Sequence, residues 1–139
     1  MASVNTQFSI AVHLLAGLAS REGLVTSEAL AESVNTNPAF VKRVLAKMSR
    51  AALIRTHTGK LGGCELARGA EKITLRDVYV AVEAPKAFAI HSYPANKSCV
   101  ISRNIKGVMG EVSIAAQQAF EAEIAKTTIA DIVQKIEAS

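Results

Sequence analysis

Apolar residues recur at intervals of three or four positions through most of the chain, which is the spacing of one face of a helix. A first helix is expected to begin after Thr6, which is placed to cap it, and to end at Arg21–Gly23. The apolar positions of this helix are Phe8, Ile10, Ala11, Leu14, Leu15 and Leu18.

Two short helices joined by a turn are expected next. Thr26 or Ser27 caps the first of them, because short hydroxyl side chains favour that position. Asn35–Asn37 forms the turn, and Pro38 suits the first turn of the second helix. The buried face of the second helix is expected to consist of Phe40, Val41, Val44, Leu45 and Met48.

A β-hairpin is expected after these helices. Leu53–His57 and Cys64–Ala67 have the composition of paired strands, and Thr58–Gly63 is a glycine-rich connection. Residues 27–67 therefore predict a helix-turn-helix followed by a wing. This shape places a helix in the major groove of DNA.

The rest of the chain predicts three more helices. The first starts at Ile73–Leu75 with Thr74 as its cap, and an irregular loop follows it. A long helix is expected from about Val100 to Lys126, and Thr127 or Thr128 caps a short last helix. The apolar positions that form one face of the long helix are Ile101, Ile105, Val108, Val112, Ala115, Ala119 and Ile124.

The predicted fold is mainly α with a small β-hairpin, a winged helix-turn-helix domain plus a long C-terminal dimerisation helix. We expect a DNA-binding domain at residues 1–83, a sensor or linker loop at 84–99, and the dimerisation and C-terminal helices at 100–139. A helix of about 25 residues is roughly 37 Å long, too long for such a small domain to bury. A homodimer through Val100–Lys126 would cover it.

Composition narrows the class of protein. Half of the 139 residues are hydrophobic and 4% are aromatic, which favours helices packed through aliphatic and small side chains. We see no signal-peptide pattern and no apolar run of the ~18 residues that a membrane span needs. Two cysteines are too few for a disulfide scaffold. We therefore expect a cytoplasmic protein that binds no membrane.

Basic residues are concentrated in the segment that predicts the helix-turn-helix and wing. Residues 38–72 contain eight basic and two acidic side chains, a net charge of +6 in a chain of +4. Residues 111–139 contain five acids and two bases, which makes them a poor surface for DNA. The basic residues are Lys42, Arg43, Lys47, Arg50, Arg55, Lys60, Arg68 and Lys72.

The expected contacts with double-stranded DNA follow from this division. The start of the third helix would read bases, and the wing would contact phosphates or the minor groove. Charged side chains on a helix are more often simply exposed to solvent. Here the turn, the wing and the charge asymmetry together favour DNA binding instead. The candidates are Ser27, Asn37, Pro38, Ala39, Lys42, Arg43, Lys47, Arg55, His57, Thr58, Gly59, Lys60 and Gly62.

Several ordered motifs carry a family resemblance. They are SIAVHLLAGLA, LAESVNTNPAFVKRVLAKMSRAALI, GKLGGCELAR and ITLRDVYVAVE. From about Phe8 to Lys126 the chain resembles the IscR/NsrR/CymR-type winged helix-turn-helix regulators, the bacterial Rrf-two family. The resemblance implies a homodimer, a recognition helix at about Pro38–Arg50, a wing at about Thr56–Glu65, an inverted-repeat operator and, most commonly, repression.

The cysteines depart from the iron–sulfur members of that family. Those members hold a cluster with three cysteines between the fourth helix and the long helix, where this chain has only Cys99. One thiolate does not replace the usual set of about four ligands, so we expect no cluster, no other cofactor and no metal site. Residues 96–105 are instead similar to the lone-cysteine, YwnA-like branch.

Cys99 is the candidate sensor, with His91 as a neighbour in sequence. Cys99 precedes the long helix and lies near Lys97 and Arg103, and a helix N-terminus and cations favour a reactive thiolate. Alternatives are an inert packed cysteine or a small-molecule pocket around His91. An enzyme using Cys99 as nucleophile and His91 as base lacks a recognisable orienting residue, so we expect no enzyme. A winged-helix protein-interaction module is a further alternative.

Overall fold

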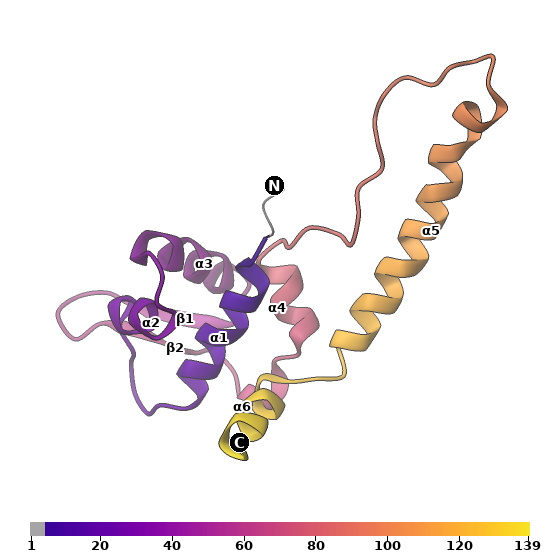
Figure 1. Cartoon of the computed structure of the whole chain (residues 1–139). Coiled ribbons are helices and arrows are strands. Elements are labelled where there is room, and N and C mark those ends of the chain that lie inside the picture. The colour runs from indigo at the N-terminus through magenta and orange to yellow at the C-terminus, as the bar shows by residue number, and fades with distance from the viewer. Residues whose placement is uncertain (1–4) are drawn as a thin grey trace. The chain divides into compact units, whose positions relative to one another are not determined.

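The structure is a computed structural model that describes residues 5–139 (Figure 1). Within these residues a two-stranded antiparallel sheet accompanies a set of helices. The predicted fold class, mainly α with a small β-hairpin, is confirmed. The elements are α1 (Gln7–Ala19), α2 (Ser27–Val34), α3 (Pro38–Arg50), β1 (Ile54–His57), β2 (Gly63–Leu66), the 3-10 helix η1 (Ala70–Lys72), α4 (Leu75–Ala81), α5 (Val100–Ile124) and α6 (Ile129–Glu137).

Local capping chemistry explains where most helices begin. The Thr26 hydroxyl accepts a hydrogen bond from the Ala29 amide, which selects Thr26 rather than Ser27 as the cap of α2. Thr128 caps α6. Thr6 precedes α1, but its side chain makes no capping hydrogen bond; the Asn5 side chain accepts from the first amide of the helix instead.

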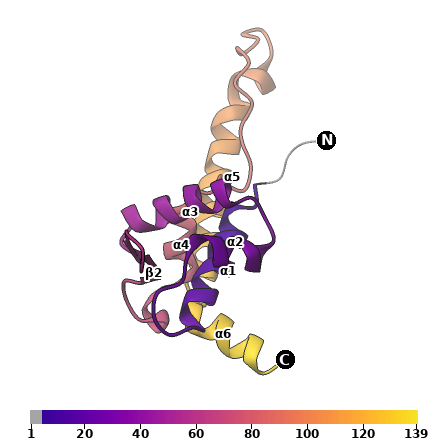
Figure 2. The same ribbon diagram turned by 90° about the vertical axis from the view of Figure 1, so that its left-hand side faces the viewer.

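One compact unit comprises residues 5–84 and 124–139, called here the helix–wing unit. Helix α1 packs on α2, α3, α4 and α6, so its apolar stripe forms the centre of the core. Figure 2 gives a second view of these helices beside the hairpin. The large, fully buried side chains are Leu14, Leu15, Leu30, Met48, Leu53, Ile54, Ile73, Ile129, Val41, Val44, Val78 and Val82.

Helix α6 belongs to the helix–wing unit and not with α5. Ile129 is completely buried in the core, and α6 packs on α1 and η1. The expected grouping of residues 100–139 is therefore divided at residue 124. The apolar face of α6 needs a partner surface, and the pattern alone does not say which surface supplies it.

Residues 85–123 form a second compact unit, called here the long-helix unit. Residues 88–96 have no helix or strand, in agreement with the predicted loop, and α5 follows at Val100. The loop is tied to α5 at several points: the Ala87 amide donates to the Gln117 side chain at 3.1 Å, and the Lys106 ammonium donates to the Tyr93 carbonyl. Helix α5 ends at Ile124, slightly before the expected Lys126.

Candidate nucleic-acid interface

The wing, the start of α2 and the outer side of α3 enclose a concavity of about 650 Å³ in the helix–wing unit. It brings together candidates that are up to 35 positions apart in the sequence. These candidates are Ser27, Lys42, His57, Thr58, Gly59, Lys60 and Gly62. Lys42, Lys60 and the acidic Glu28 line the concavity, and all three are exposed, so two cations face one anion and its balance is positive.

Helix α3 presents a stripe of alternating small and long side chains on the side away from the core. At about 3.6 residues per turn, positions i, i+4, i+7 and i+11 lie on one face. The face opposite the buried Val41, Val44 and Met48 carries this stripe, and each of its residues is exposed. Its members are Ala39, Arg43, Ala46 and Arg50.

The stripe combines close approach with hydrogen-bonding capacity. Alanine side chains let the helix backbone come near a partner, and arginine presents donors that match the edge of guanine or a phosphate. Arg50 was not among the expected DNA contacts. The signal that would have found it is its spacing of seven residues from Arg43.

Asn37 and Pro38 build the start of α3. The Asn37 side-chain oxygen accepts a hydrogen bond from the Ala39 amide at 2.7 Å, and Pro38 occupies the first turn. Asn37 therefore caps α3. It is also exposed at the start of the helix.

Lys47 differs from the other candidates on α3. Its ammonium donates to the Gln7 side-chain oxygen at 2.9 Å and to the Val82 carbonyl at 3.4 Å. Lys47 thereby ties α3 to the start of α1 and to the end of α4. These hydrogen bonds give Lys47 a role in packing that its position in the sequence did not indicate, and its contact with DNA stays a prediction.

The glycine doublet of the wing is required by the packing of the hairpin itself. A Cβ atom on Gly62 would lie 2.2 Å from the His57 carbonyl oxygen, and one on Gly63 would lie 2.9 Å from the Val25 carbonyl oxygen. The tip residue Gly59 has a φ of +99° and nothing within 4 Å of such a Cβ. Close approach to a duplex is therefore open at Gly59, while Gly62 is needed to close the turn.

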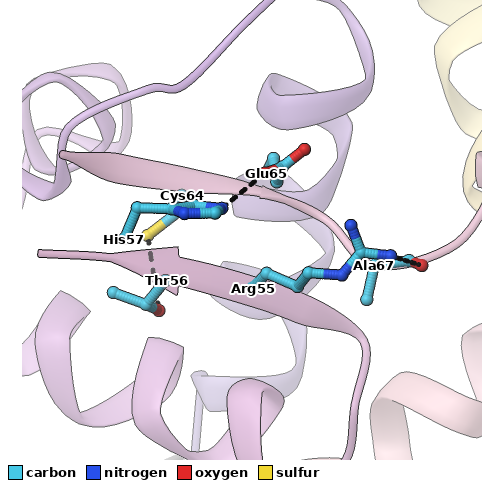
Figure 3. Close-up of polar contacts among 6 residues, drawn as sticks. All are labelled: Arg55, Thr56, His57, Cys64, Glu65 and Ala67. Atoms are coloured by element: carbon cyan, nitrogen blue, oxygen red, sulfur yellow. Dashed lines mark hydrogen bonds and ion pairs between the residues drawn. The ribbon is translucent and has the colours of Figure 1, made fainter. Parts of the chain in front are cut away.

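Two of the basic residues of the wing have partners within the hairpin (Figure 3). His57 Nε2 lies 2.5 Å from Glu65 Oε2, and the Arg55 guanidinium donates to the Ala67 carbonyl at 3.0 Å. These contacts stiffen the exposed face of the hairpin. In contrast, Lys60 at the tip makes no ion pair within the part of the chain that the structure describes.

Cys64 lies on the buried side of β2, beside Thr56 on β1 (Figure 3). Burial raises the pKa of the Cys64 thiol, and its contact with the Thr56 hydroxyl lowers that pKa by a smaller amount. The backbone of Cys64 also pairs with Val25, since each residue donates an N–H to the carbonyl of the other. Cys64 is thus a neutral core residue beneath the wing.

Cys99 is half-buried just before α5. Its sulfur accepts a hydrogen bond from the Ser102 amide at 3.4 Å, and its own amide donates to the Asn96 carbonyl. His91 is exposed in the preceding loop, and no hydrogen bond or ion pair joins it to Cys99 among residues 5–139.

Comparison with known proteins identifies relatives that are transcription regulators. The profile of the Rrf2 family, described as iron-dependent transcriptional regulators, matches residues 4–135. YwnA of Bacillus subtilis (strain 168), named as an HTH-type transcriptional regulator, is 31% identical over 134 residues, which cover 96% of this chain and 98% of YwnA.

The cysteines of this chain do not fit an iron–sulfur cluster held by one subunit. Cys64 is buried in the helix–wing unit, and Cys99 belongs to the long-helix unit. Such a cluster takes about four thiolate or histidine ligands. In the described part of the chain, no group of three or more His, Cys, Asp or Glu side chains is arranged to hold a metal ion.

Solved structures share this fold. A transcriptional regulator from Lactobacillus plantarum matches with a TM-score of 0.79 and 25% identity, covering 95% of this chain and 90% of that protein. CymR of B. subtilis, the global cysteine regulator, matches in fold with a TM-score of 0.70 and 18% identity, covering 97% and 98%. Within residues 5–139, no helix has the length and hydropathy of a membrane span. The chain belongs to the Rrf2 family, and it is therefore a DNA-binding transcription regulator and not an enzyme.

Proposed function

We propose that this protein is a cytoplasmic homodimeric repressor that binds an inverted-repeat operator without an iron–sulfur cluster. The observation that carries the proposal is the concavity between α2, α3 and the wing, together with the adjoining stripe Ala39–Arg43–Ala46–Arg50. These surfaces combine a helix of suitable shape for the major groove with nearby cations for the backbone.

In this proposal the contacts divide into two kinds. Arg43 reads a base edge, and Ala39 and Ala46 let α3 enter the groove closely. Lys42 and Lys60 neutralise phosphates on either side of the concavity, and Gly59 lets the tip of the wing approach the duplex. Lys47 is left out because its ammonium is already held by Gln7 and Val82.

A second copy of the chain is proposed to cover α5. Large apolar side chains on this helix are exposed, including Ile101 (65%), Val108 (54%) and Val112 (48%). They recur at helical spacing, and Gly107 beside them has open space around it. A two-fold dimer through this face would present two α3 helices to two half-sites about one helical turn of DNA apart.

Selection of bound fragments from genomic DNA tests the proposal. A palindromic consensus is expected, and no enrichment over random DNA would overturn it. The double variant Lys42→Ala/Arg43→Ala should lose operator binding while its circular dichroism spectrum stays unchanged. Lys135→Ala, an exposed lysine on α6, is the matched control and should bind as the unmodified protein does.

Dimerisation and repression need separate measurements. Sedimentation equilibrium should give a dimer, and Val108→Glu should shift it to a monomer, because a charge on the helix face that the dimer would bury opposes association. In a reporter strain, deletion of the protein should raise transcription from the selected operator. Lower transcription on deletion would identify an activator instead.

The signal is proposed to act through Cys99. Oxidation of this half-buried thiol would disturb its hydrogen bond from the Ser102 amide at the start of α5. A Cys99→Ser variant should stay bound to the operator in peroxide that releases the unmodified protein. If both proteins release DNA alike, a ligand pocket in the loop around His91 becomes the hypothesis to test.

A further inference from the structure

Arg43 has one aromatic neighbour on the recognition helix. Its guanidinium carbon lies 5.4 Å from the centre of the Phe40 ring, one turn earlier on α3. Phe40 is half-buried and packs against the core of the helix–wing unit, whereas Arg43 is exposed. The ring therefore has a fixed position from which it can hold the arginine.

Lys47, a second cation of α3, is arranged differently. The Lys47 ammonium is bound by two oxygen acceptors. Arg43 makes no hydrogen bond or ion pair with the part of the chain that is described. Its guanidinium instead lies over the ring of Phe40. A stacked guanidinium keeps the N–H donors on its edge available while its side chain loses conformational freedom.

Such an arrangement matters for reading a base. A long side chain that is already oriented loses less conformational entropy on binding than a free one. The two parallel hydrogen bonds to guanine also require a particular orientation of the guanidinium plane. If the Phe40 ring orients Arg43 before DNA binds, the bidentate contact with guanine is favoured over less directional contacts with phosphates.

We propose that Phe40 is a positioning residue for sequence reading: its ring orients Arg43 toward a guanine in each half-site. This inference rests on the proposed function, because it assumes that α3 enters the major groove. It adds that discrimination at one base pair of the operator depends on a side chain that does not itself contact DNA.

The test compares the selected operator with versions in which each G·C pair of the half-site is replaced in turn by A·T. Phe40→Leu should weaken operator binding by about two- to five-fold, the range expected for a cation–ring contact. Discrimination at one G·C position should fall by the same factor, and Phe40→Tyr, which retains a ring, should restore it. In an Arg43→Ala background, Phe40→Leu should have no further effect on either quantity.

A purely structural role of Phe40 predicts other results. If Phe40→Leu weakens binding to all operator versions equally, or does so equally without Arg43, the inference is overturned. Phe8→Leu is the matched control, because Phe8 packs edge-on against Tyr79 in the same unit, whereas the ring contact of Arg43 is with Phe40; it should leave discrimination unchanged. Phe40→Met replaces Phe40→Leu if urea denaturation shows that the latter is unfolded.

Failure of the proposed function would be visible in the unmodified protein. If that protein selects no DNA sequence, no operator exists and the function itself fails. If it selects an operator, and the Phe40→Leu variant discriminates among the operator versions as strongly as the unmodified protein does, only the positioning role fails.

Discussion

Thr74 and Thr128 face each other across an antiparallel bridge at the start of α4 and α6. On either side of this pair, the Leu75 amide donates to the Thr127 carbonyl and the Ile129 amide donates to the Ile73 carbonyl, both at 2.9 Å. Each threonine also forms a capping box with an aspartate. The chain that returns from α5 is therefore fixed to the helix–wing unit at the first residues of α4.

Loss of one cap in this pair should lower stability. Thr128→Ala removes the acceptor of the Asp131 amide and should reduce the free energy of unfolding by about 1 kcal/mol, as for other N-caps. Urea denaturation measures the change. Thr127→Ala is the control, since only the backbone of Thr127 takes part in the pairing, and an equal loss in both variants would contradict the capping account.

Substitution of Gly62 should destabilise the wing. Gly62→Ala places a Cβ 2.2 Å from the His57 carbonyl oxygen, so the hairpin must shift. We expect a loss of about 1–3 kcal/mol in stability and weaker DNA binding. Gly107→Ala is the matched control: its Cβ meets nothing within 4 Å inside α5, so helix propensity should make it neutral or stabilising for the single chain.

The salt dependence of DNA binding should separate the lysines. Removal of Lys42 or Lys60 should weaken binding and reduce the slope of log K against log salt by about 0.9 for each lost phosphate contact. Lys47→Ala should leave the slope unchanged and instead lower stability by about 1 kcal/mol, through its lost hydrogen bonds. A reduced slope for Lys47→Ala would show that its ammonium leaves Gln7 to contact DNA.

The raised pKa of Cys64 predicts a dependence of stability on alkaline pH. Below the ordinary thiol pKa of 9.0, the folded and unfolded states both carry the protonated thiol. As the pH rises above 9.0, the unfolded state ionises first, so the free energy of unfolding falls until the pH passes the folded pKa.

Comparison with Cys64→Ala isolates this effect. The stability difference between the unmodified protein and the variant should shrink above pH 9.0. Alkylation near neutral pH should be slow at Cys64 and faster at the half-buried Cys99. Rapid labelling of Cys64 in the folded protein would mean that the wing opens readily.

Ala52 offers a stabilising substitution. It follows α3 with a φ of 60°, a left-handed conformation that is costly for a residue with a Cβ. Ala52→Gly should therefore raise the free energy of unfolding by about 0.5–1 kcal/mol. Ala51→Gly, at a φ of −85°, is the adjacent control and should not stabilise the protein.

The sequence by itself determined the α-helices and the two strands and their order, although not the short helix η1. The helical spacing of Leu14, Leu18 and their neighbours, the proline at the start of α3 and the threonine caps act over a few residues, so they can be interpreted without a tertiary structure. The basic segment and the family motifs, which are equally local, located the candidate DNA-binding surface.

Only the tertiary structure decided which side chains of that surface are already bound within the protein and which are left to contact DNA. Gln7 and Val82 hold Lys47 over separations of 40 and 35 residues, and no local pattern encodes such contacts. The place of α6 in the helix–wing unit and the packing of Gly63 against Val25 have the same origin. An apolar helix face or a glycine indicates that another part of the protein packs against it. Which part packs there depends on how segments that are far apart in the sequence come together in the fold.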